Sequence, residues 1–298
     1  MTATVKNHVH LNDLSSASAV WSFHDELYLA GDDVPWLYQL DSEFNITNKC
    51  QLSNVDSLVN GRTPGDIKAD FESMEIFNLN GEDVALVLPS GSKEISRDTG
   101  YLVSITDQKI LYKNNIRRLY NKIIAKAKIE RGELNMEGLA ISDKHIYLLQ
   151  RGNITKNFVV RIPRSEFLNF FRHHTILPDI SLFYFDLPKN DSVVAGFSGA
   201  CIAPDQQGLF FTASLENTGT ALADGEVQGS YLGYIPFCKM KKGEYAITKL
   251  EYNGKTFAKK LEGITIKNTL EGIGYEVITV CDNDDGTSDI IELTIALN

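Results

Sequence analysis

One short pattern recurs five times along the chain and constrains the fold more than any other feature. It consists of an apolar or small residue, then Glu or Ser, then a small residue, then apolar residues at alternate positions. The copies begin at Ala17, Phe71, Met136, Phe197 and Leu261, of which the first is the weakest. The repeated Glu or Ser positions are separated by 54, 65, 61 and 64 residues. An internal repeat of this length predicts a modular architecture built from one repeated unit.

Each copy of the pattern opens a series of short apolar runs separated by turn-forming residues. In the third repeat these runs are residues 136–141, 145–152 and 157–163, and residues 181–187 supply a fourth. Runs of this length that are rich in Val, Ile, Leu, Tyr and Phe, and are bounded by Asp, Asn and Gly, are typical of strands joined by hairpins. Each repeat therefore predicts a four-stranded antiparallel sheet.

The ends of the chain indicate how the repeats close. Only 36 residues follow Glu262, so the last repeat lacks an outer strand, and residues 3–11 can supply it. Joining the two ends in one sheet protects the sheet edges of a ring. We therefore predict an all-β fold, a five-bladed β-propeller of four-stranded antiparallel blades, closed by an N-terminal strand that joins the last blade. Two β-sandwiches are the alternative.

We expect the propeller to be a single domain that spans residues 1–298. Its blades are approximately residues 12–60, 66–130, 131–190, 191–255, and 256–298 together with strand 3–11. Two segments with apolar residues at helical spacing, residues 114–133 and 163–174, interrupt the strand pattern. We expect both to be helices in the outer connections of blades, where insertions are tolerated.

Composition excludes several classes of function. The chain has 39 acidic and 29 basic residues and a net charge of −10, which argues against a general binder of nucleic acid or anionic membranes. No apolar stretch approaches the roughly 18 residues of a membrane span, and the first residues lack the pattern of a secretory signal. The four cysteines form no CxxC motif, which favours reduced thiols. We expect a cytoplasmic monomer without nucleic-acid or membrane partners.

The repeated Glu or Ser lies on the innermost strand of each blade, and these strands line the central channel of a propeller. One position per blade predicts an axial ring made of Ser18, Glu72, Glu137, Ser198 and Glu262. Three converging carboxylates repel one another unless a positive charge lies among them. A donor set made only of oxygen suits Ca²⁺ better than zinc. The axial ring therefore predicts a Ca²⁺ site.

Two alternatives to this metal site stay open. The carboxyl groups of the axial ring can instead be protonated or bridged by water. Strict strand alternation also places each Glu on the same side as the apolar residues two and four positions later, unless the Glu lies at a bend before the strand.

A second set of polar residues follows the second strand of each blade, where the hairpins reach one channel mouth. The candidate substrate-binding residues are Asp32, Lys93, Arg97, Arg151, Glu216 and Asp282. Cations come from blades two and three and acids from the other blades, a division that suits a phosphate ester bound over a metal. Turn propensity alone also places Asp, Asn and Ser in hairpins. The sequence assigns no catalytic residue.

Several phrases resemble blades of calcium-dependent propellers, namely NMEGLAISDKHIYLL, KLEGITI and FSGACIAPDQQGLFFTASLEN. The order Ser, Glu, Glu, Ser, Glu resembles the five-bladed calcium-activated apyrases, which implies a central Ca²⁺ and hydrolysis of nucleoside diphosphates at one channel mouth. The Glu-Gly phrases also resemble phytase-like and esterase-like bacterial propellers and the SdiA-regulated group. Residues 14–41 are most similar to an uncharacterised bacterial propeller family.

Two functions are compatible with these features. The first is a calcium-dependent hydrolase of a phosphorylated or ester small molecule, with Ca²⁺ on the axial ring and an anionic group on the cations of the mouth. The second is a non-catalytic binding or scaffold propeller with a structural axial cation or none. Fold alone does not distinguish them, because propellers support both classes.

Overall fold

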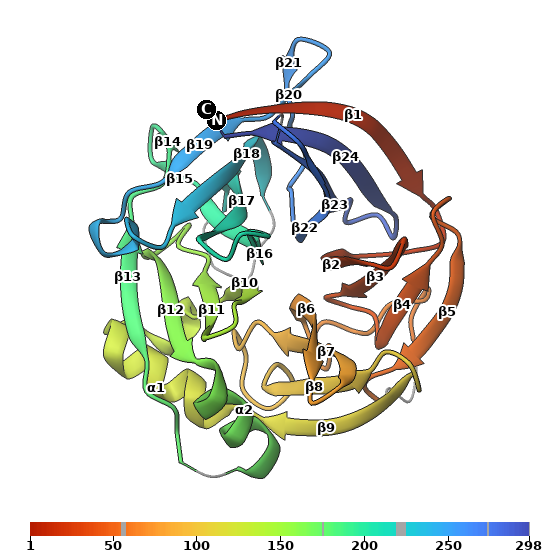
Figure 1. Ribbon diagram of the computed structural model, residues 1–298, viewed down its shortest axis with the longest axis vertical. Coiled ribbons are helices and arrows are strands. Elements are labelled where there is room, and N and C mark those ends of the chain that lie inside the picture. The colour runs from red at the N-terminus through yellow and green to blue at the C-terminus, as the bar shows by residue number, and fades with distance from the viewer. Residues whose placement is uncertain (55–57, 175, 219–224, 273, 298) are drawn as a thin grey trace.

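The computed structural model describes residues 1–54, 58–174, 176–218, 225–272 and 274–297. Five four-stranded antiparallel sheets stand as blades around a central axis (Figure 1). The first blade contains β2 (Ala17–Phe23), β3 (Glu26–Gly31), β4 (Trp36–Leu40) and β5 (Ile46–Gln51). The second contains β6 (Phe71–Leu79), β7 (Glu82–Pro89), β8 (Thr99–Ser104) and β9 (Lys109–Asn115). This arrangement confirms the five-bladed propeller predicted from the repeat.

The next two blades follow in chain order. The third contains β10 (Met136–Ile141), β11 (His145–Gln150), β12 (Asn157–Pro163) and β13 (Ser181–Phe185). The fourth contains β16 (Gly196–Ile202), β17 (Gly208–Asn217), β18 (Glu226–Pro236) and β19 (Ala246–Lys249). Two small ribbons extend from the outer connections, and they are β14 (Lys189–Asn190) with β15 (Val193–Val194), and β20 (Glu251–Tyr252) with β21 (Lys255–Thr256).

The fifth blade joins the two ends of the chain. It contains β22 (Ile264–Leu270), β23 (Gly274–Asp282), β24 (Ser288–Ala296) and, as its outer strand, β1 (Thr2–Leu11). The pairing of β1 with β24 runs from Thr2–Ala296 to Leu11–Ser288, and Figure 1 shows the two termini side by side. The predicted closure of the ring by the N-terminal strand is therefore confirmed.

Two helices and two short 3-10 turns lie in the outer connections. Helix α1 (Arg117–Ala127) is shorter than the predicted segment 114–133, because Lys128 adopts a left-handed conformation (φ 55°) and ends the helix. Helix α2 (Arg164–His173) matches its prediction closely. The 3-10 turns are Arg131–Glu133 and Met240–Lys242. No helix in the described part of the chain is long and apolar enough to cross a bilayer.

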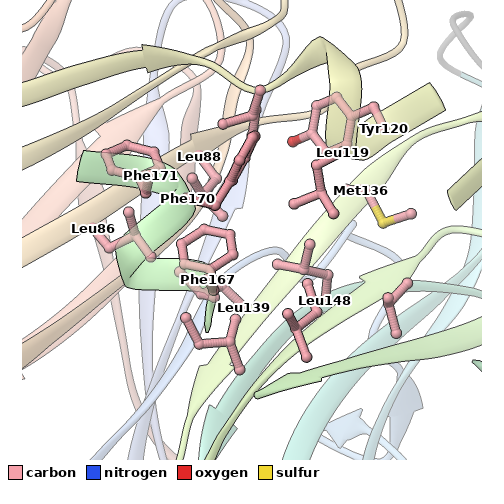
Figure 2. Packing of buried hydrophobic residues seen from close by; sticks show 14 of the residues in the cluster. Leu86, Leu88, Leu119, Tyr120, Met136, Leu139, Leu148, Phe167, Phe170 and Phe171 are labelled. Carbon is pink, nitrogen blue, oxygen red and sulfur yellow. The ribbon is translucent and has the colours of Figure 1, made fainter. Parts of the chain in front are cut away.

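The largest apolar cluster joins the two helices to the second and third blades (Figure 2). Phe167 and Phe171 of α2 are fully buried there and stack with ring centroids 5.7 Å apart. Tyr120 of α1 also enters this cluster, and its hydroxyl donates a hydrogen bond to the carbonyl oxygen of Pro89 at the end of β7. The helices thus fix the hairpin that leads from β7 to the channel mouth.

Gly91 follows in that hairpin and packs directly against Tyr120. Its φ is +73°, and a Cβ at this position would lie 2.5 Å from the Tyr120 ring. Only glycine fits both the backbone conformation and the space. The contact holds Ser90 and Ser92, the two neighbours of Gly91, at the channel mouth.

Candidate functional site

The residues of the axial ring lie at irregular points of the inner strands. In the first blade the register passes from the pair Ala17–Gly31 directly to Ala19–Ala30, so that Ser18 is the extra residue of a β-bulge. The same irregularity leaves Glu72, Glu137 and Ser198 without a cross-strand partner. A bulged residue departs from strand alternation, which explains how these side chains avoid the side that the later apolar residues occupy.

The fifth copy of the pattern differs slightly, because Glu262 precedes β22. Its N–H donates to the carbonyl oxygen of Val280 at 2.8 Å, and the N–H of Gly263 donates to the carbonyl oxygen of Ser18 at 2.8 Å. The inner strands approach closely around the axis, since a Cβ on Gly199 would lie 2.4 Å from the carbonyl oxygen of Glu262. The small residue after each Glu or Ser therefore allows the backbones to crowd together.

A narrow cavity lies on the axis beside this ring. Residues of all five inner strands line it, including Glu72 and Glu137. The space open to the centre of a water molecule is about 10 Å³, close to what one water molecule or one bare ion needs. The axial cavity is thus matched to a single small occupant.

Glu137 is buried beside a cation that the chain itself supplies. Arg151 donates to Glu137 Oε1 at 2.8 Å and also pairs with Glu216, and all three side chains are at most 7% exposed. Asn135 Nδ2 donates to the same Oε1 at 2.8 Å. Burial alone would lower the pKa of Arg151, but Glu137 and Glu216 raise it. Among the described residues, Glu137 Oε2 has no hydrogen-bond partner.

Glu262, like Glu137, has one carboxylate oxygen in contact with a cation of the chain, while its other oxygen has no partner among the described residues. Lys260 Nζ lies 2.6 Å from Glu262 Oε1, and Glu262 Oε2 has no hydrogen-bond partner in the part of the chain that the structure describes. Burial raises the pKa of Glu262 well above its ordinary value, against the opposing effect of Lys260 and with a further contribution from Glu137. Burial therefore makes the ionised form of this carboxyl group less favourable than it is in water, and Lys260 offsets part of this effect.

The hydroxyl groups of the two serines of the axial ring donate hydrogen bonds to nearby backbone carbonyl oxygens. Ser18 Oγ donates to the carbonyl oxygen of Ser16 at 3.2 Å, and Ser198 Oγ donates to the carbonyl oxygen of Leu261. Each oxygen keeps lone pairs that can accept a proton or coordinate a cation.

Glu72 makes no hydrogen bond or ion pair with the described residues, although only 8% of it is exposed. Burial and the neighbouring carboxylates of Asp70 and Glu137 raise the pKa of Glu72 well above its ordinary value. Carboxylate oxygens of Asp32, Asp70 and Glu72 lie within 4.8 Å of one another, and we call these three residues the acidic trio. Within the described part of the chain, no other group of three or more His, Cys, Asp and Glu side chains meets this criterion.

The tightest carboxylate cluster is therefore displaced from the axis toward the first two blades. Only Glu72 belongs both to the acidic trio and to the axial ring. Lys68 Nζ lies between the other two carboxylates, 3.0 Å from Asp70 Oδ1 and in close contact with Asp32. Burial would lower the pKa of Lys68, but Asp70, Asp32 and Glu72 raise it.

The predicted mouth residues fall into separate groups, with Asp32 and Arg97 around Asp70 and with Arg151 paired to Glu216, and the cations have internal partners. Arg97 Nη1 lies 2.8 Å from Asp70 Oδ2 and 2.9 Å from Ser92 Oγ. Lys93 is exposed and donates to the carbonyl oxygen of Asp66 at 3.1 Å. With Arg151 held by Glu137 and Glu216, each predicted cation of the mouth contacts an acceptor of this chain.

The predicted acids of the mouth lie in different settings. Asp32 belongs to the acidic trio, whereas Glu216 pairs with Arg151 and accepts a hydrogen bond from the N–H of Gly225 at 2.7 Å. Asp282 contacts neither group through an ion pair in the described residues. Burial, with a contribution from the charge of Asp32, raises the pKa of Asp282 to about 7.

Sequence reasoning missed the residues immediately before the axial ring. Asp70, Asn135 and Lys260 each precede a ring glutamate by two positions, and Asn135 and Lys260 contact their own glutamate. Their common offset from the repeat is the signal that could have found them. Lys68 does not share this offset from the repeat. Its place among the carboxylates depends on the path of the connection between the first two blades.

Comparison with known protein families identifies one match. Residues 13–295 match a family whose description is "Family of unknown function (DUF6929)". No curated protein matches the chain. The match covers all five inner strands and all five residues of the axial ring.

Solved structures with similar folds are distant in sequence. The aldose sugar dehydrogenase of Streptomyces coelicolor, in its PQQ-bound form, is 12% identical with a TM-score of 0.48, over 98% of this chain and 98% of that chain. The glutaminyl cyclase of Myxococcus xanthus is 8% identical with a TM-score of 0.47, over 99% and 97%. The virginiamycin B lyase of Staphylococcus aureus is 11% identical with a TM-score of 0.41, over 99% and 100%. None of these activities is carried over to this chain.

Proposed function

The chain belongs to the DUF6929 family of unknown function, and from the geometry of the channel mouth we propose that the propeller binds a divalent cation of the Ca²⁺ type there. The cation would lie near Glu72, the one carboxylate shared by the axial ring and the acidic trio. Glu137, Glu262, Ser18 and Ser198 of the axial ring are its further candidate oxygen ligands, and they would have to move closer, because within the described residues only the acidic trio brings three carboxylates within 4.8 Å of one another. In this proposal the propeller is a binding protein, and the cation either completes its centre or helps to hold a small molecule.

One observation carries the proposal, namely the lack of partners on buried carboxylate oxygens. Within the described residues, the buried atoms Glu137 Oε2 and Glu262 Oε2 have no hydrogen-bond partner. The Glu72 side chain, 8% exposed, likewise makes no hydrogen bond or ion pair with the described residues. A buried ionised carboxylate is costly unless it is paired or coordinates a metal. The cations present are already in contact with other carboxylate oxygens, so additional positive charge would stabilise this centre.

The chemistry of these donors fits a hard cation. All the ligands are oxygens, which Ca²⁺ and Mg²⁺ prefer, and the flexible coordination of Ca²⁺ tolerates an irregular set of carboxylates and hydroxyls. A cation there would also favour the ionised forms of Glu72 and Glu262, whose pKa values burial raises. Protonated carboxyl groups without a metal are the competing explanation.

Calorimetric titration with Ca²⁺, Mg²⁺ and Mn²⁺ after treatment with a chelator tests the proposal. We expect the wild type to bind Ca²⁺ and to unfold at a higher temperature in its presence. Glu72→Gln and Glu137→Gln should weaken binding, whereas Glu271→Gln, which changes an exposed glutamate, should not. Absence of binding at millimolar Ca²⁺ between pH 6 and 8 would contradict the proposal and favour protonated carboxyl groups.

The hydrolase prediction is a second proposal, and the geometry supports it less. Its anion-binding residues Arg97 and Arg151 are both engaged by carboxylates of the chain, so a phosphate would have to displace Asp70, Glu137 or Glu216. A panel of nucleotides, phosphomonoesters and carboxylic esters, assayed with and without Ca²⁺, separates the two proposals. Turnover that depends on Ca²⁺ and is lost in Glu137→Gln would favour the hydrolase.

A further inference from the structure

Residues 62–70 belong to the connection between the first two blades and contact residues of the channel mouth, and we call them the mouth strap. Its backbone is fixed to the first blade, because Thr63 N–H donates to the Asp33 carbonyl oxygen at 2.6 Å and Asp70 N–H donates to the Asp32 carbonyl oxygen at 2.9 Å. On the side of the second blade, Lys93 and Arg97 donate to the carbonyl oxygens of Asp66 and Gly65. The strap is thus held from both sides.

The side chains of the mouth strap reach back to the first and fifth blades. Arg62 pairs with Asp33 and donates to the carbonyl oxygen of Asp284 at 3.1 Å. Lys68 turns inward instead, and its ammonium group lies among the acidic trio with a side-chain exposure of 17%. Lys68 therefore supplies positive charge to the carboxylate cluster with the closest packing in the described residues.

We infer that the acidic trio is itself a divalent-cation position and that Lys68 is its built-in competitor, so that an incoming cation displaces the ammonium group and loosens the mouth strap. This inference rests on the proposed cation binding and names a position and a regulation for it. The oxygens of Asp32, Asp70 and Glu72 already lie within 4.8 Å of one another, which requires little movement to surround one ion.

Two observations favour an added cation over the lysine alone. Glu72 is 8% exposed and has no hydrogen bond or ion pair with the described residues, although Lys68 lies nearby. Outside the trio, Glu137 Oε2 belongs to a side chain that lines the same axial cavity as Glu72, and it has no hydrogen-bond partner among the described residues. A monovalent ammonium group therefore leaves part of this negative charge uncompensated, whereas a divalent ion would compensate more of it.

Displacement of Lys68 has a mechanical consequence for the strap. The N–H groups of Ile67 and Lys68 donate to the carbonyl oxygen of Pro64 at 3.0 and 2.9 Å, in a turn whose inward anchor is the Lys68 side chain. Ile67 is 51% exposed, so its apolar side chain contributes little to holding this turn. Loss of the Lys68 contact leaves the turn attached at its flanks and through the hydrogen bonds that Lys93 and Arg97 donate to the carbonyl oxygens of Asp66 and Gly65.

Removal of the competing charge tests the inference. Titration of Lys68→Met with Ca²⁺ should give a dissociation constant at least about tenfold lower than that of the wild type, which corresponds to ~1.4 kcal/mol. Lys68→Arg keeps the positive charge and should bind Ca²⁺ about as weakly as the wild type. Lys241→Met, at an exposed lysine, controls for the change in net charge. Equal or weaker binding by Lys68→Met overturns the inference.

Two further measurements keep the test valid if the variant is unstable. Lys68→Met should unfold at a lower temperature than the wild type in chelator and should gain more from Ca²⁺, because its trio has lost its ammonium group. In the wild type, hydrogen exchange of residues 62–70 should be faster with Ca²⁺ than with chelator. If neither the wild type nor any variant binds a cation, the proposed function fails as well. If the wild type binds and Lys68→Met shows no gain, only this inference fails.

Discussion

Arg151 donates a hydrogen bond of 2.8 Å to Glu137 and so ties the end of the second strand of the third blade to the axial-ring residue of the same blade. Its other terminal nitrogen contacts Glu216 of the fourth blade. One guanidinium group therefore neutralises carboxylates from two neighbouring blades at the centre of the molecule. This places Arg151 among the residues that hold the ring together, whether or not a cation is bound.

Replacement of Arg151 by methionine should destabilise the propeller strongly. Glu137 and Glu216 would lose their shared cation while staying buried, and breaking a buried ion pair on one side costs about 3–5 kcal/mol. Urea unfolding at pH 7 measures the difference. Arg118→Met, at an exposed arginine of α1, is the matched control and should change stability by less than about 0.5 kcal/mol. A similarly small effect at Arg151 would mean that water replaces the guanidinium group without cost.

The architecture could be predicted from the sequence because each repeat carries its own strands and the two chain ends complete one sheet. The axial ring could be found for the same reason, since Glu72, Glu137 and Glu262 occupy one position of the repeat. Strand alternation could not show how these side chains reach the axis. That depends on the β-bulges, which are visible only in the pairing of β6 with β7 and of β10 with β11.

Partners at the channel mouth were harder to predict than the mouth itself. Arg97 and Arg151 were expected there as anion-binding groups, and both instead contact carboxylates of the chain. Lys68 was missed, because its position follows from the path of the mouth strap between two blades. That path is fixed by backbone contacts to Asp32 and Asp33, which no local pattern specifies.

Truncation of Phe167 should separate the role of the helices from that of the channel mouth. Phe167 is fully buried between α2 and the sheets of the second and third blades, and replacing a buried phenylalanine by alanine costs about 3–5 kcal/mol. We expect Phe167→Ala to lower the free energy of unfolding by this amount while Ca²⁺ affinity stays unchanged. Phe167→Leu should cost less, because it leaves a smaller cavity. A change in Ca²⁺ affinity would show that the helices also shape the mouth.

The buried carboxyl group of Glu75 should make the folded protein less stable as the pH rises toward neutrality. This fully buried carboxyl group of β6 accepts a hydrogen bond of 2.6 Å from the N–H of Ile141 in the next blade, and burial raises its pKa well above 4.5. The folded protein therefore keeps a proton that the unfolded chain loses near pH 4.5, so this group lowers stability as the pH rises above that value. Glu75→Gln keeps the acceptor oxygen and removes the titration.

Thermal unfolding between pH 5 and 8 measures this effect. We expect the melting temperature of Glu75→Gln to exceed that of the wild type by an amount that grows with pH. Glu271→Gln, at an exposed glutamate, should leave the pH profile unchanged. A difference between wild type and Glu75→Gln that stays constant over this range would show that Glu75 does not titrate abnormally.

Asp289 lies where the ring closes, and its effect on stability should depend on pH in the opposite direction. Its buried carboxylate lies on β24 and contacts His8 Nε2 at 2.9 Å and His10 Nδ1 at 2.8 Å, both on β1, as well as Lys259. Burial alone would raise the pKa of Asp289, but hydrogen bonds from Lys259, His10 and His8 hold it well below its usual value. These contacts join the N-terminal strand to the last blade by side chains in addition to backbone pairing.

Stability from Asp289 is fully present above the unfolded pKa of about 4 and falls progressively as the pH decreases below it, because the unfolded chain then binds a proton that the folded protein excludes. Asp289→Asn should therefore lower the free energy of unfolding at pH 7 by at least about 1.5 kcal/mol, the size of one hydrogen bond to a charged group. The difference from the wild type should shrink between pH 4 and 2 in urea titrations. Hydrogen exchange along β1 should accelerate in the variant at pH 7, and unchanged exchange there would mean that backbone pairing alone closes the ring.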